Sequence, residues 1–312
     1  MEPDSWLGLE LRHLIALKAI AEHGTFGRAA KELGYTQSAI SQQIATLERI
    51  VGQRLIDRPG GPRPVSLTES GEMLLRHADA IAARLQAAQA DLAALDAGDA
   101  GPLRIGTYQS VGARILPALL REFTKEWPQV DITLRESADD RELAQLVEVA
   151  ELDLSFVVLP LDPGPYESVE LFRDPYVLVV PKGSTLASRE RPPSIREIVE
   201  QPLISYRTCR TTQRVEDRLR QSGRDPNIVF RSDDNGTVQG LVAAGVGIGV
   251  MPLLAVDETD QAIEVVDLGD RVPPRVIGVA WHRDRRRTRA AQAFVELAQK
   301  QTSQLGAGAL AA

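Results

Sequence analysis

The sequence predicts an α/β protein of two lobes that follows a small N-terminal all-α unit and a long helix. Three observations predict this fold. The 312 residues are enough for about two domains. Residues 11–70 contain three short helical patterns and then two strand-like runs around a turn. Beyond residue 100, strand and helix patterns alternate, which is typical of α/β domains with largely parallel sheets.

The composition excludes several classes of protein. Hydrophobic residues make up 43% and charged residues 25% of the chain, as in ordinary globular proteins, so collagen-like and wholly disordered chains are excluded. The single cysteine, Cys209, and four scattered histidines predict no disulfide, no metal site and no cofactor. The N-terminus lacks a signal-peptide pattern, and the longest apolar run, 240–256, is too short to span a membrane. We therefore expect a cytoplasmic protein without a membrane partner.

The charge is unevenly distributed along the chain. The net charge is −7, yet residues 11–70 hold eight basic and five acidic residues and carry +3. A small basic unit on a larger acidic body is expected when only one end of a protein meets a polyanion. This asymmetry points to DNA as a candidate partner of the N-terminal unit.

The first of the three short helices is predicted over about residues 11–22, with Gly24 as its end. Apolar residues at helical spacing predict its buried face: Leu11, Leu14, Ile15 and Leu17. Thr25 is a good N-cap for a second helix that runs through Leu33.

Thr36 can cap a third helix, which Gly52 ends. Its buried face follows the spacing i, i+4, i+7: Ile40, Ile44 and Leu47. Two short runs around the turn-rich segment 59–62 then predict a two-stranded wing.

The second and third helices have the features of a helix-turn-helix. Ala29 and Ala30 allow two helices to cross closely, and Gly34 permits the turn. Polar side chains at the start of the third helix can reach base edges in the major groove: Thr36, Gln37, Ser38, Ser41 and Gln42. Basic residues around them can contact phosphates: Arg28, Arg49, Arg54, Arg58 and Arg63. From geometry alone, a three-helix packing unit without DNA binding remains the alternative.

A long helix is predicted from the Thr68 cap to about Asp96. Its apolar residues recur with alternating spacings of four and three: Leu74, Ala78, Ile81, Leu85, Ala88, Leu92 and Leu95. Such a heptad seam predicts pairing with a second helix, and we expect it to join two chains in a homodimer. The residues assigned to this dimerisation are Leu74, Ile81, Leu85, Ala88, Leu92 and Leu95. The alternative is an amphipathic helix that lies on its own domain.

Two successive series of strands and helices in residues 98–302 predict two lobes around a cleft. In open α/β lobes, ligands bind at the carboxyl ends of strands, close to helix N-termini. The residues at such positions, with one apolar wall, are Tyr108, Gln109, Ser110, Val111, Ser137, Phe156, Tyr206, Arg207, Thr208, Asn235 and Thr237. Because arginine pairs with carboxylates, arginines at the cleft favour an anionic small molecule. For each single residue, helix capping is the alternative role.

The segment from Thr25 to Leu75 also matches a known family. It reads TFGRAAKELGYTQSAISQQIATLERIVGQRLIDRPGGPRPVSLTESGEMLL and resembles the N-terminal winged helix-turn-helix of LysR-type transcriptional regulators. Further on, LDLSFV and LVAAGVGIGVMP resemble two elements of the same family, so that the resemblance covers about residues 9–300. The chain departs mildly from the family pattern at Ser38, where proline is frequent, and at Ile56, where phenylalanine is frequent.

The resemblance implies a regulator of transcription that is not an enzyme and that binds double-stranded promoter DNA. It implies a winged helix-turn-helix domain over 1–67, a dimerisation helix over 68–97 and an effector domain over 98–302, with 303–312 expected to be a disordered tail. The effector domain would be like periplasmic binding proteins, with a small molecule between its lobes. Homodimers would usually assemble into homotetramers, and RNA polymerase is an additional partner that this interpretation allows.

Two other interpretations of the chain have an incidental helical hairpin at the N-terminus: a cytoplasmic α/β enzyme and a solute-binding protein. The sequence shows no nucleophile elbow, P-loop or metal motif of an enzyme. A solute-binding protein would be expected to carry a signal peptide.

Overall fold

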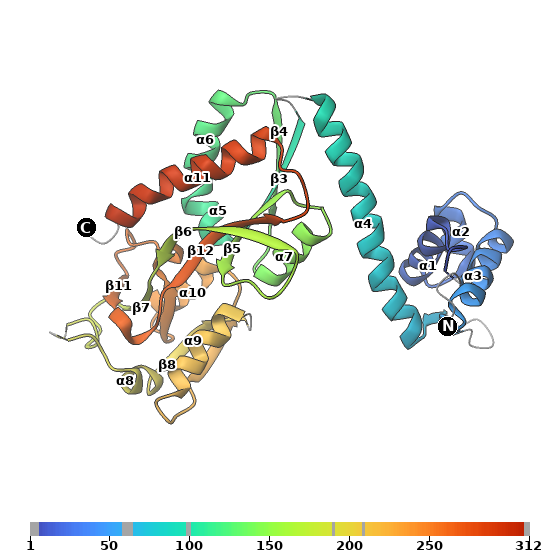
Figure 1. The fold of residues 1–312 in the computed structure, drawn as a ribbon. Coiled ribbons are helices and arrows are strands. Elements are labelled where there is room, and N and C mark those ends of the chain that lie inside the picture. The colour runs from blue at the N-terminus through green and yellow to red at the C-terminus, as the bar shows by residue number, and fades with distance from the viewer. Residues whose placement is uncertain (1–5, 58–64, 98–100, 189–190, 208–209, 309–312) are drawn as a thin grey trace. The chain divides into compact units, whose positions relative to one another are not determined.

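The computed structural model describes residues 6–57, 65–97, 101–188, 191–207 and 210–308 (Figure 1). The chain divides into two compact units, residues 1–90 and 91–312. Arg58 and Arg63, predicted to contact DNA, and Thr208, predicted to line the ligand cleft, lie outside the described residues. Within the described part of the chain, no helix combines the length and the apolar character needed to cross a bilayer.

The first unit contains three short helices and a two-stranded antiparallel wing. Its elements are α1 (Leu11–His23), α2 (Phe26–Glu32), α3 (Gln37–Val51), β1 (Ile56–Asp57) and β2 (Ser66–Leu67). The threonine caps are formed as expected: Thr25 Oγ1 accepts from the Arg28 N–H and Thr36 Oγ1 from the Ala39 N–H, both at 3.2 Å. Gly24 and Gly52 end α1 and α3 with φ of 69° and 76°, a conformation that favours glycine.

The core of the first unit differs from the prediction on α1. Ile40, Ile44 and Leu47 of α3 are fully buried as predicted. On α1, however, Leu11 and Ile15 are exposed, whereas Leu14 and Leu17 are buried. The buried side of α1 also includes Ile20 and the small or polar residues His13, Ala16 and Ala19. The apolar pattern alone placed this face wrongly, because small side chains such as Ala16 let α2 and α3 approach closely.

The long helix α4 (Glu69–Ala97) begins after Thr68, whose Oγ1 accepts from the Gly71 N–H at 3.0 Å. The division between the two units falls within this helix. Since α4 belongs to both units, it is their covalent connection.

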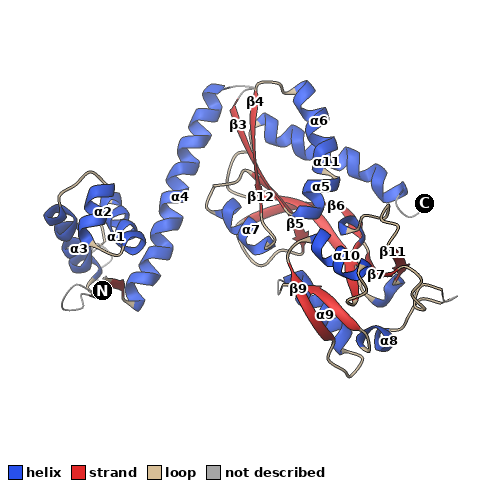
Figure 2. Cartoon of the chain, turned by 180° about the vertical axis from the view of Figure 1, so that it is seen from behind, coloured by secondary structure: helices blue, strands red, loops and turns tan. Residues whose placement is uncertain are grey.

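The second unit holds two five-stranded mixed sheets, one in each lobe, with helices packed against them (Figure 2). In lobe I the strand order is β4-β3-β5-β12-β6. These strands are β3 (Gly101–Thr107), β4 (Val130–Glu136), β5 (Leu154–Leu159), β6 (Tyr166–Asp174) and β12 (Arg275–His282). β3 is parallel to β4 and β5, whereas β12 is antiparallel to β5 and β6. The helices of lobe I are α5 (Gln109–Arg114), α6 (Leu116–Glu126), α7 (Asp140–Glu148) and α11 (Arg289–Gly308).

Lobe II has the strand order β11-β7-β10-β8-β9. Its strands are β7 (Tyr176–Pro181), β8 (Pro202–Tyr206), β9 (Asn227–Ser232), β10 (Ile248–Pro252) and β11 (Ile263–Asp267). β8, β9 and β10 run parallel to one another, and β7 is antiparallel to β10 and β11. The helices are α8 (Ile195–Val199), α9 (Arg210–Arg220), α10 (Asn235–Ala243), and the short 3-10 helices η1 (Leu253–Ala255) and η2 (Gly269–Arg271).

The chain passes from lobe I to lobe II at Pro175 and returns over residues 272–274. The crossing strands β6 and β12 are paired next to this connection, with Asp174 opposite Arg275. Two neighbouring crossings of this kind form a hinge, so the cleft between the lobes can open and close about them.

Two expectations about lobe I need correction. Phe156, expected as a wall of the ligand cleft, is fully buried in the core of lobe I, where its ring centroid lies 6.4 Å from that of Phe294. β5 is an inner strand of its sheet, so Phe156 has neighbours on all sides. The tail predicted to be disordered from residue 303 is helical to Gly308, since α11 continues through it. Glutamine, leucine and alanine in this segment are good helix formers.

Candidate nucleic-acid interface and ligand cleft

The start of α3 presents a row of polar side chains to solvent. Gln37, Ser38 and Gln42 are exposed and Ser41 is half-buried. Amides and hydroxyls in this position can donate to and accept from base edges. Thr36 is also exposed, but its hydroxyl caps α3 and bonds the Ser38 hydroxyl at 3.0 Å. Gln37, Ser41 and Gln42 are therefore the better candidates for base contacts.

Three arginines of the first unit are available for phosphates. Arg28, Arg49 and Arg54 are exposed, and they form no ion pair with any residue in the described part of the chain. The acidic residue Glu48, near these arginines in the sequence, bonds to the backbone and not to a guanidinium: its Oε1 accepts from the Leu55 N–H at 2.9 Å. Free guanidinium groups around an exposed polar helix end are typical of a DNA-binding surface.

The seam on α4 divides into two parts. Leu74 and Ala78 are buried in the core of the first unit, at 6% and 3% exposure. Leu74 therefore packs on its own chain, and its assignment to dimerisation is corrected: the neighbouring α1–α3 bundle covers the first turns of α4. By contrast Ile81, Leu85 and Leu92 are 45%, 49% and 65% exposed. Ala88 is exposed as well, whereas the side chain of Leu95 lies outside the described part of the structure.

A cavity of about 340 Å³ lies between the two lobes of the second unit. Strand-end residues of both lobes line it, as the sequence predicts for Tyr108, Gln109, Ser110, Tyr206, Arg207 and Asn235. The first three follow β3 in lobe I. In lobe II, Tyr206 ends β8, Arg207 follows it and Asn235 begins α10. The structure thus brings residues more than 90 positions apart to one site.

Three other candidates do not line this cavity. Val111 is fully buried in the core of lobe I. The Ser137 hydroxyl donates to Glu142 Oε2 at 2.6 Å and accepts from the Asp139 N–H, so it shapes the turn before α7. The Thr237 hydroxyl donates to Asp234 Oδ1 at 2.8 Å at the start of α10. The hydrogen bonds that Ser137 and Thr237 make at the starts of α7 and α10 explain why polar residues occur at these two strand-end positions.

The structure adds Arg275 to the cavity, a residue that the strand-end rule does not find. Its guanidinium forms an ion pair with Asp174 at 2.7 Å and donates to Ser110 Oγ at 2.8 Å. It also lies 5.3 Å from the centroid of the Tyr108 ring. Burial is the largest single influence and lowers the pKa of Arg275. Asp174 together with Tyr108 and Tyr176 more than offsets it, so the pKa of the guanidinium is raised. Arg275 therefore stays charged at the hinge and orients the Ser110 hydroxyl.

Gln109 connects the two lobes at the rim of the cavity. Its amide donates to Asp234 Oδ2 at 2.7 Å, and its carbonyl oxygen accepts from the Asn235 N–H at 2.8 Å. Within lobe II, the Tyr206 hydroxyl donates to Asn235 Oδ1 at 2.9 Å. Hydrogen bonds from Gln109 and Thr237 hold the pKa of Asp234 below its usual value.

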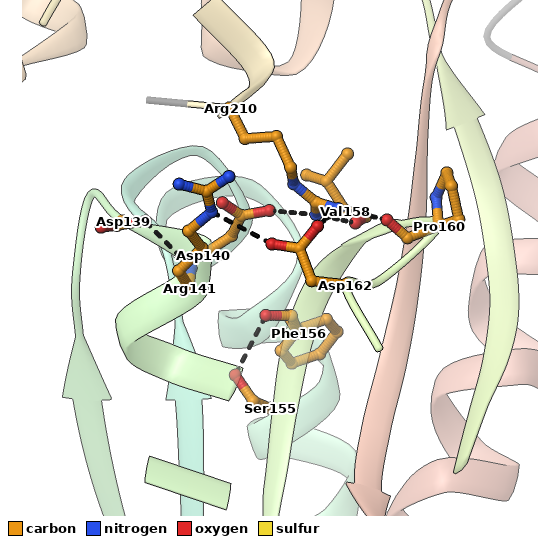
Figure 3. Close-up of polar contacts among 9 residues, drawn as sticks. All are labelled: Asp139, Asp140, Arg141, Ser155, Phe156, Val158, Pro160, Asp162 and Arg210. Carbon is orange, nitrogen blue, oxygen red and sulfur yellow. Dashed lines mark hydrogen bonds and ion pairs between the residues drawn. The ribbon is translucent and has the colours of Figure 1, made fainter. Parts of the chain in front are cut away.

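A second connection between the lobes is made by Arg210 of α9 (Figure 3). Its guanidinium pairs with the buried Asp140 of α7, donates to the carbonyl oxygens of Pro160 and Val158, the latter at 2.6 Å, and lies 3.7 Å from Asp162. The Arg210 side chain is only 9% exposed. A buried charge of this kind is expensive to leave unpaired, so these contacts favour the lobe arrangement seen here.

The arginines that line the cavity do not support the expected anionic ligand. Arg275 is paired with Asp174, and Arg207 is paired with Asp233 at 3.1 Å. The cavity is also lined by four carboxylates: Glu136, Asp140, Asp233 and Asp234. The expectation of an anionic ligand considered only the arginines, because the sequence does not show which acidic residues the fold places beside them.

Together these features define the class of the protein: a helix-turn-helix unit is joined by a long helix to a two-lobed domain of the substrate-binding type. Residues 11–72 match the model of the bacterial regulatory helix-turn-helix protein of the lysR family, and residues 96–303 match the LysR substrate binding domain. The chain therefore belongs to the LysR family of transcriptional regulators, as the sequence resemblance predicts.

Relatives and solved structures agree with this assignment. The HTH-type transcriptional regulator AlsR of Bacillus subtilis is 34% identical to this chain, over 83% of the chain and 87% of AlsR. HinK, a LysR family transcriptional regulator from Pseudomonas aeruginosa, has a TM-score of 0.60 at 25% identity, covering 96% of this chain and all of HinK. Full-length CbnR, solved in complex with its target DNA, has the same fold with a TM-score of 0.65 at 22% identity, covering 94% of this chain and 99% of CbnR. AlsR and HinK are regulators of transcription, and CbnR shows that the fold is shared.

Proposed function

We propose that this regulator binds promoter DNA through α3 and the wing, and that a small molecule bound between the lobes of the second unit controls its activity. The observation that carries the proposal is the cavity lined by strand-end residues of both lobes, close to the hinge at Asp174 and Arg275. A ligand there contacts both lobes at once. It therefore stabilises the arrangement of lobes that it fits best.

DNA recognition is assigned to the first unit. Gln37, Ser41 and Gln42 would read base edges, while Arg28, Arg49 and Arg54 would contact the phosphate backbone. The exposure of these side chains and the +3 charge of residues 11–70 support this division. The structure of CbnR with its target DNA supports double-stranded DNA as the partner.

Assembly is assigned to α4. Ile81, Leu85, Ala88 and Leu92 form an exposed apolar row with heptad spacing, and we assign them to a homodimer in which α4 pairs with α4 of a second chain. The row is the part of the seam that the first unit leaves uncovered. The proposed function further includes assembly of dimers into a tetramer, contact with RNA polymerase and a cytoplasmic location.

The test of the proposed function is a gel shift with DNA from upstream of the protein's own gene. We expect this DNA to be bound more tightly than random DNA of equal length, with an affinity that falls as salt rises, because phosphate contacts release counterions. Equal affinity for the two DNAs would show that the first unit is not a sequence-specific reader.

A further inference from the structure

The cavity between the lobes has an unusual chemical character that narrows the class of its ligand. We propose that the ligand is a small organic ammonium compound with a short apolar body. This inference rests on the proposed function, since it concerns the same cavity. Charge, unsatisfied polar atoms and aromatic side chains in the cavity each support it.

The first observation is the charge that remains after every ion pair is counted. The carboxylates of Asp233 and Asp140 face Arg207 and Arg210, respectively. Glu136 and Asp234 also line the cavity, and neither carboxylate contacts a cation within the described part of the chain. Two negative charges are therefore left uncompensated. A carboxylate ligand would meet like charges here, whereas an ammonium group would be attracted.

The second observation concerns polar atoms that lack a partner. The Tyr108 hydroxyl and Asp140 Oδ1 are buried and have no hydrogen-bond partner among the residues that the structure describes. Both residues line the cavity and are more than nine-tenths buried. Asp140 Oδ1 can only accept, and the Tyr108 hydroxyl can also accept. Because neither atom is exposed to solvent, the N–H donors of a ligand reach them only when the lobes move apart, and a carboxylate would not satisfy Asp140.

The third observation is a concentration of tyrosines. Three of the five tyrosines in the chain line this cavity: Tyr108, Tyr176 and Tyr206. Aromatic rings attract cations through their electron-rich faces, as the Tyr108 ring already does for Arg275, and organic ammonium ligands are recognised in this way. The remaining surface includes Val158, Val215 and Val250. These side chains suit a short apolar group attached to the ammonium, and about 340 Å³ is at the small end of ligand cavities.

The guanidinium groups of the cavity already have hydrogen-bond partners, which disfavours an anionic ligand. Arg275 already donates to Asp174 and Ser110, and Arg207 is held by Asp233. An anionic ligand at the buried Arg275 would have to compete with Asp174 for the guanidinium. The displaced Asp174, only 3% exposed, would then be left as an unpaired buried charge, which is strongly unfavourable.

The experiment compares matched ligands on the full-length protein by isothermal titration calorimetry. One set shares a phenylethyl body: phenethylammonium, 2-phenylethanol and 3-phenylpropionate. A second set shares a butyl body: butylammonium, 1-butanol and pentanoate. We expect at least one ammonium compound to bind at least about tenfold more tightly than its alcohol and carboxylate analogues, as for one added charge interaction. Equal binding of ammonium and alcohol, tighter binding of a carboxylate, or binding of neither ammonium compound would overturn the proposal.

Variants then locate the effect. Glu136→Gln removes one uncompensated charge from an exposed position, so the fold should be retained, and we expect ammonium binding to weaken about tenfold. Glu126→Gln makes the same change at the end of α6, outside the residues that line the cavity, and should leave the affinity unchanged. If Glu136→Gln and Glu126→Gln behaved alike, the cavity would not be the site that recognises the charge.

The gel shift described above separates this inference from the proposed function. If the protein prefers upstream DNA but binds carboxylates more tightly, the proposed regulatory function stands and only the ammonium ligand is rejected. If it binds ammonium compounds but has no DNA preference, the ligand proposal stands and the proposed DNA recognition is rejected.

Discussion

At the scale of single residues, the two surfaces of this protein are built in opposite ways. On the first unit Arg28, Arg49 and Arg54 have no acidic partner among the described residues, as a surface for phosphates requires. In the cleft, Arg207 and Arg275 are neutralised by aspartates. Arginine content alone therefore does not identify an anion site, because the partner of each guanidinium decides which charge remains exposed.

A pair of substitutions distinguishes base contacts from phosphate contacts. Gln37→Ala should cost about 1–3 kcal/mol of binding to the preferred DNA and reduce the preference over random DNA, because a base-edge contact is lost. Arg49→Ala should weaken binding to both DNAs alike and reduce the salt dependence by about one counterion. Competition gel shifts over a salt series measure both effects. An unchanged preference in Gln37→Ala would remove α3 as the reading helix.

Asp234 makes the connection between the lobes sensitive to acid. Its pKa lies below the ordinary value of 3.8 because Gln109 and Thr237 donate to the charged carboxylate. A group with a lowered pKa stabilises the folded protein above its unfolded-state pKa, and this stabilisation is lost as the pH falls through the folded-state value. We expect Asp234→Ala to lower the melting temperature near pH 6, with a difference from the wild type that shrinks as the pH falls below the ordinary pKa of 3.8. A difference independent of pH would show that the charge of Asp234 is not involved.

At the scale of elements, α4 illustrates how far sequence patterns reach. The seam was predicted as one continuous row, yet Leu74 and Ala78 are buried in the first unit and only the later residues are exposed. Periodicity shows which side of a helix is apolar, but the neighbouring elements decide what covers it. For the same reason Leu11 and Ile15 were wrongly expected in the core. The caps at Thr25 and Thr36 were predicted well, because each depends on bonds within three residues.

The ligand cleft was predicted only in part, and for a related reason. Strand-end residues such as Ser110 and Tyr206 follow from the general rule for α/β lobes. Arg275 does not, since its partner Asp174 is 101 residues away and is brought beside it by the pairing of β6 with β12. Val111 and Phe156 were placed in the cleft because sequence position cannot show which side of an element meets the core.

The exposed part of the α4 seam gives a prediction about assembly. Ile81→Asp combined with Leu92→Asp places two charges in the row that we assign to the dimer. Burying them should cost several kcal/mol and separate the chains that α4 joins, which sedimentation velocity detects as a lower mass than that of the wild type. Ala80→Asp is the matched control, because Ala80 is exposed and lies off the seam. If the double variant kept the mass of the wild type, α4 would not be the surface that joins the chains.

At the scale of the whole molecule, the two units are joined covalently through α4, while ligand and DNA are assigned to different units. Control of transcription by the ligand then requires that the ligand binds two arrangements of the assembly with different affinity. Gln109 and Arg210 bond across the lobes and favour the arrangement described here. A ligand that moves the lobes must compete with these bonds. The free energy of these bonds adds to the difference in affinity that the ligand needs between the two arrangements.

Thermodynamic linkage turns this requirement into a prediction. If the ligand changes the affinity for promoter DNA by some factor, the DNA must change the affinity for the ligand by the same factor, typically about 5–150-fold. The experiment titrates the tightest-binding ammonium compound into the full-length protein with and without its upstream DNA. Gel shifts with and without that compound supply the reciprocal factor.

Gln109→Ala, which removes two bonds between the lobes, should change the ligand affinity measured without DNA, since it alters the balance of arrangements that the ligand selects. The ligand affinities with and without DNA could be equal while transcription from the promoter still responds to the compound. The response would then not pass through DNA affinity, and control would have to act on a later step such as contact with RNA polymerase.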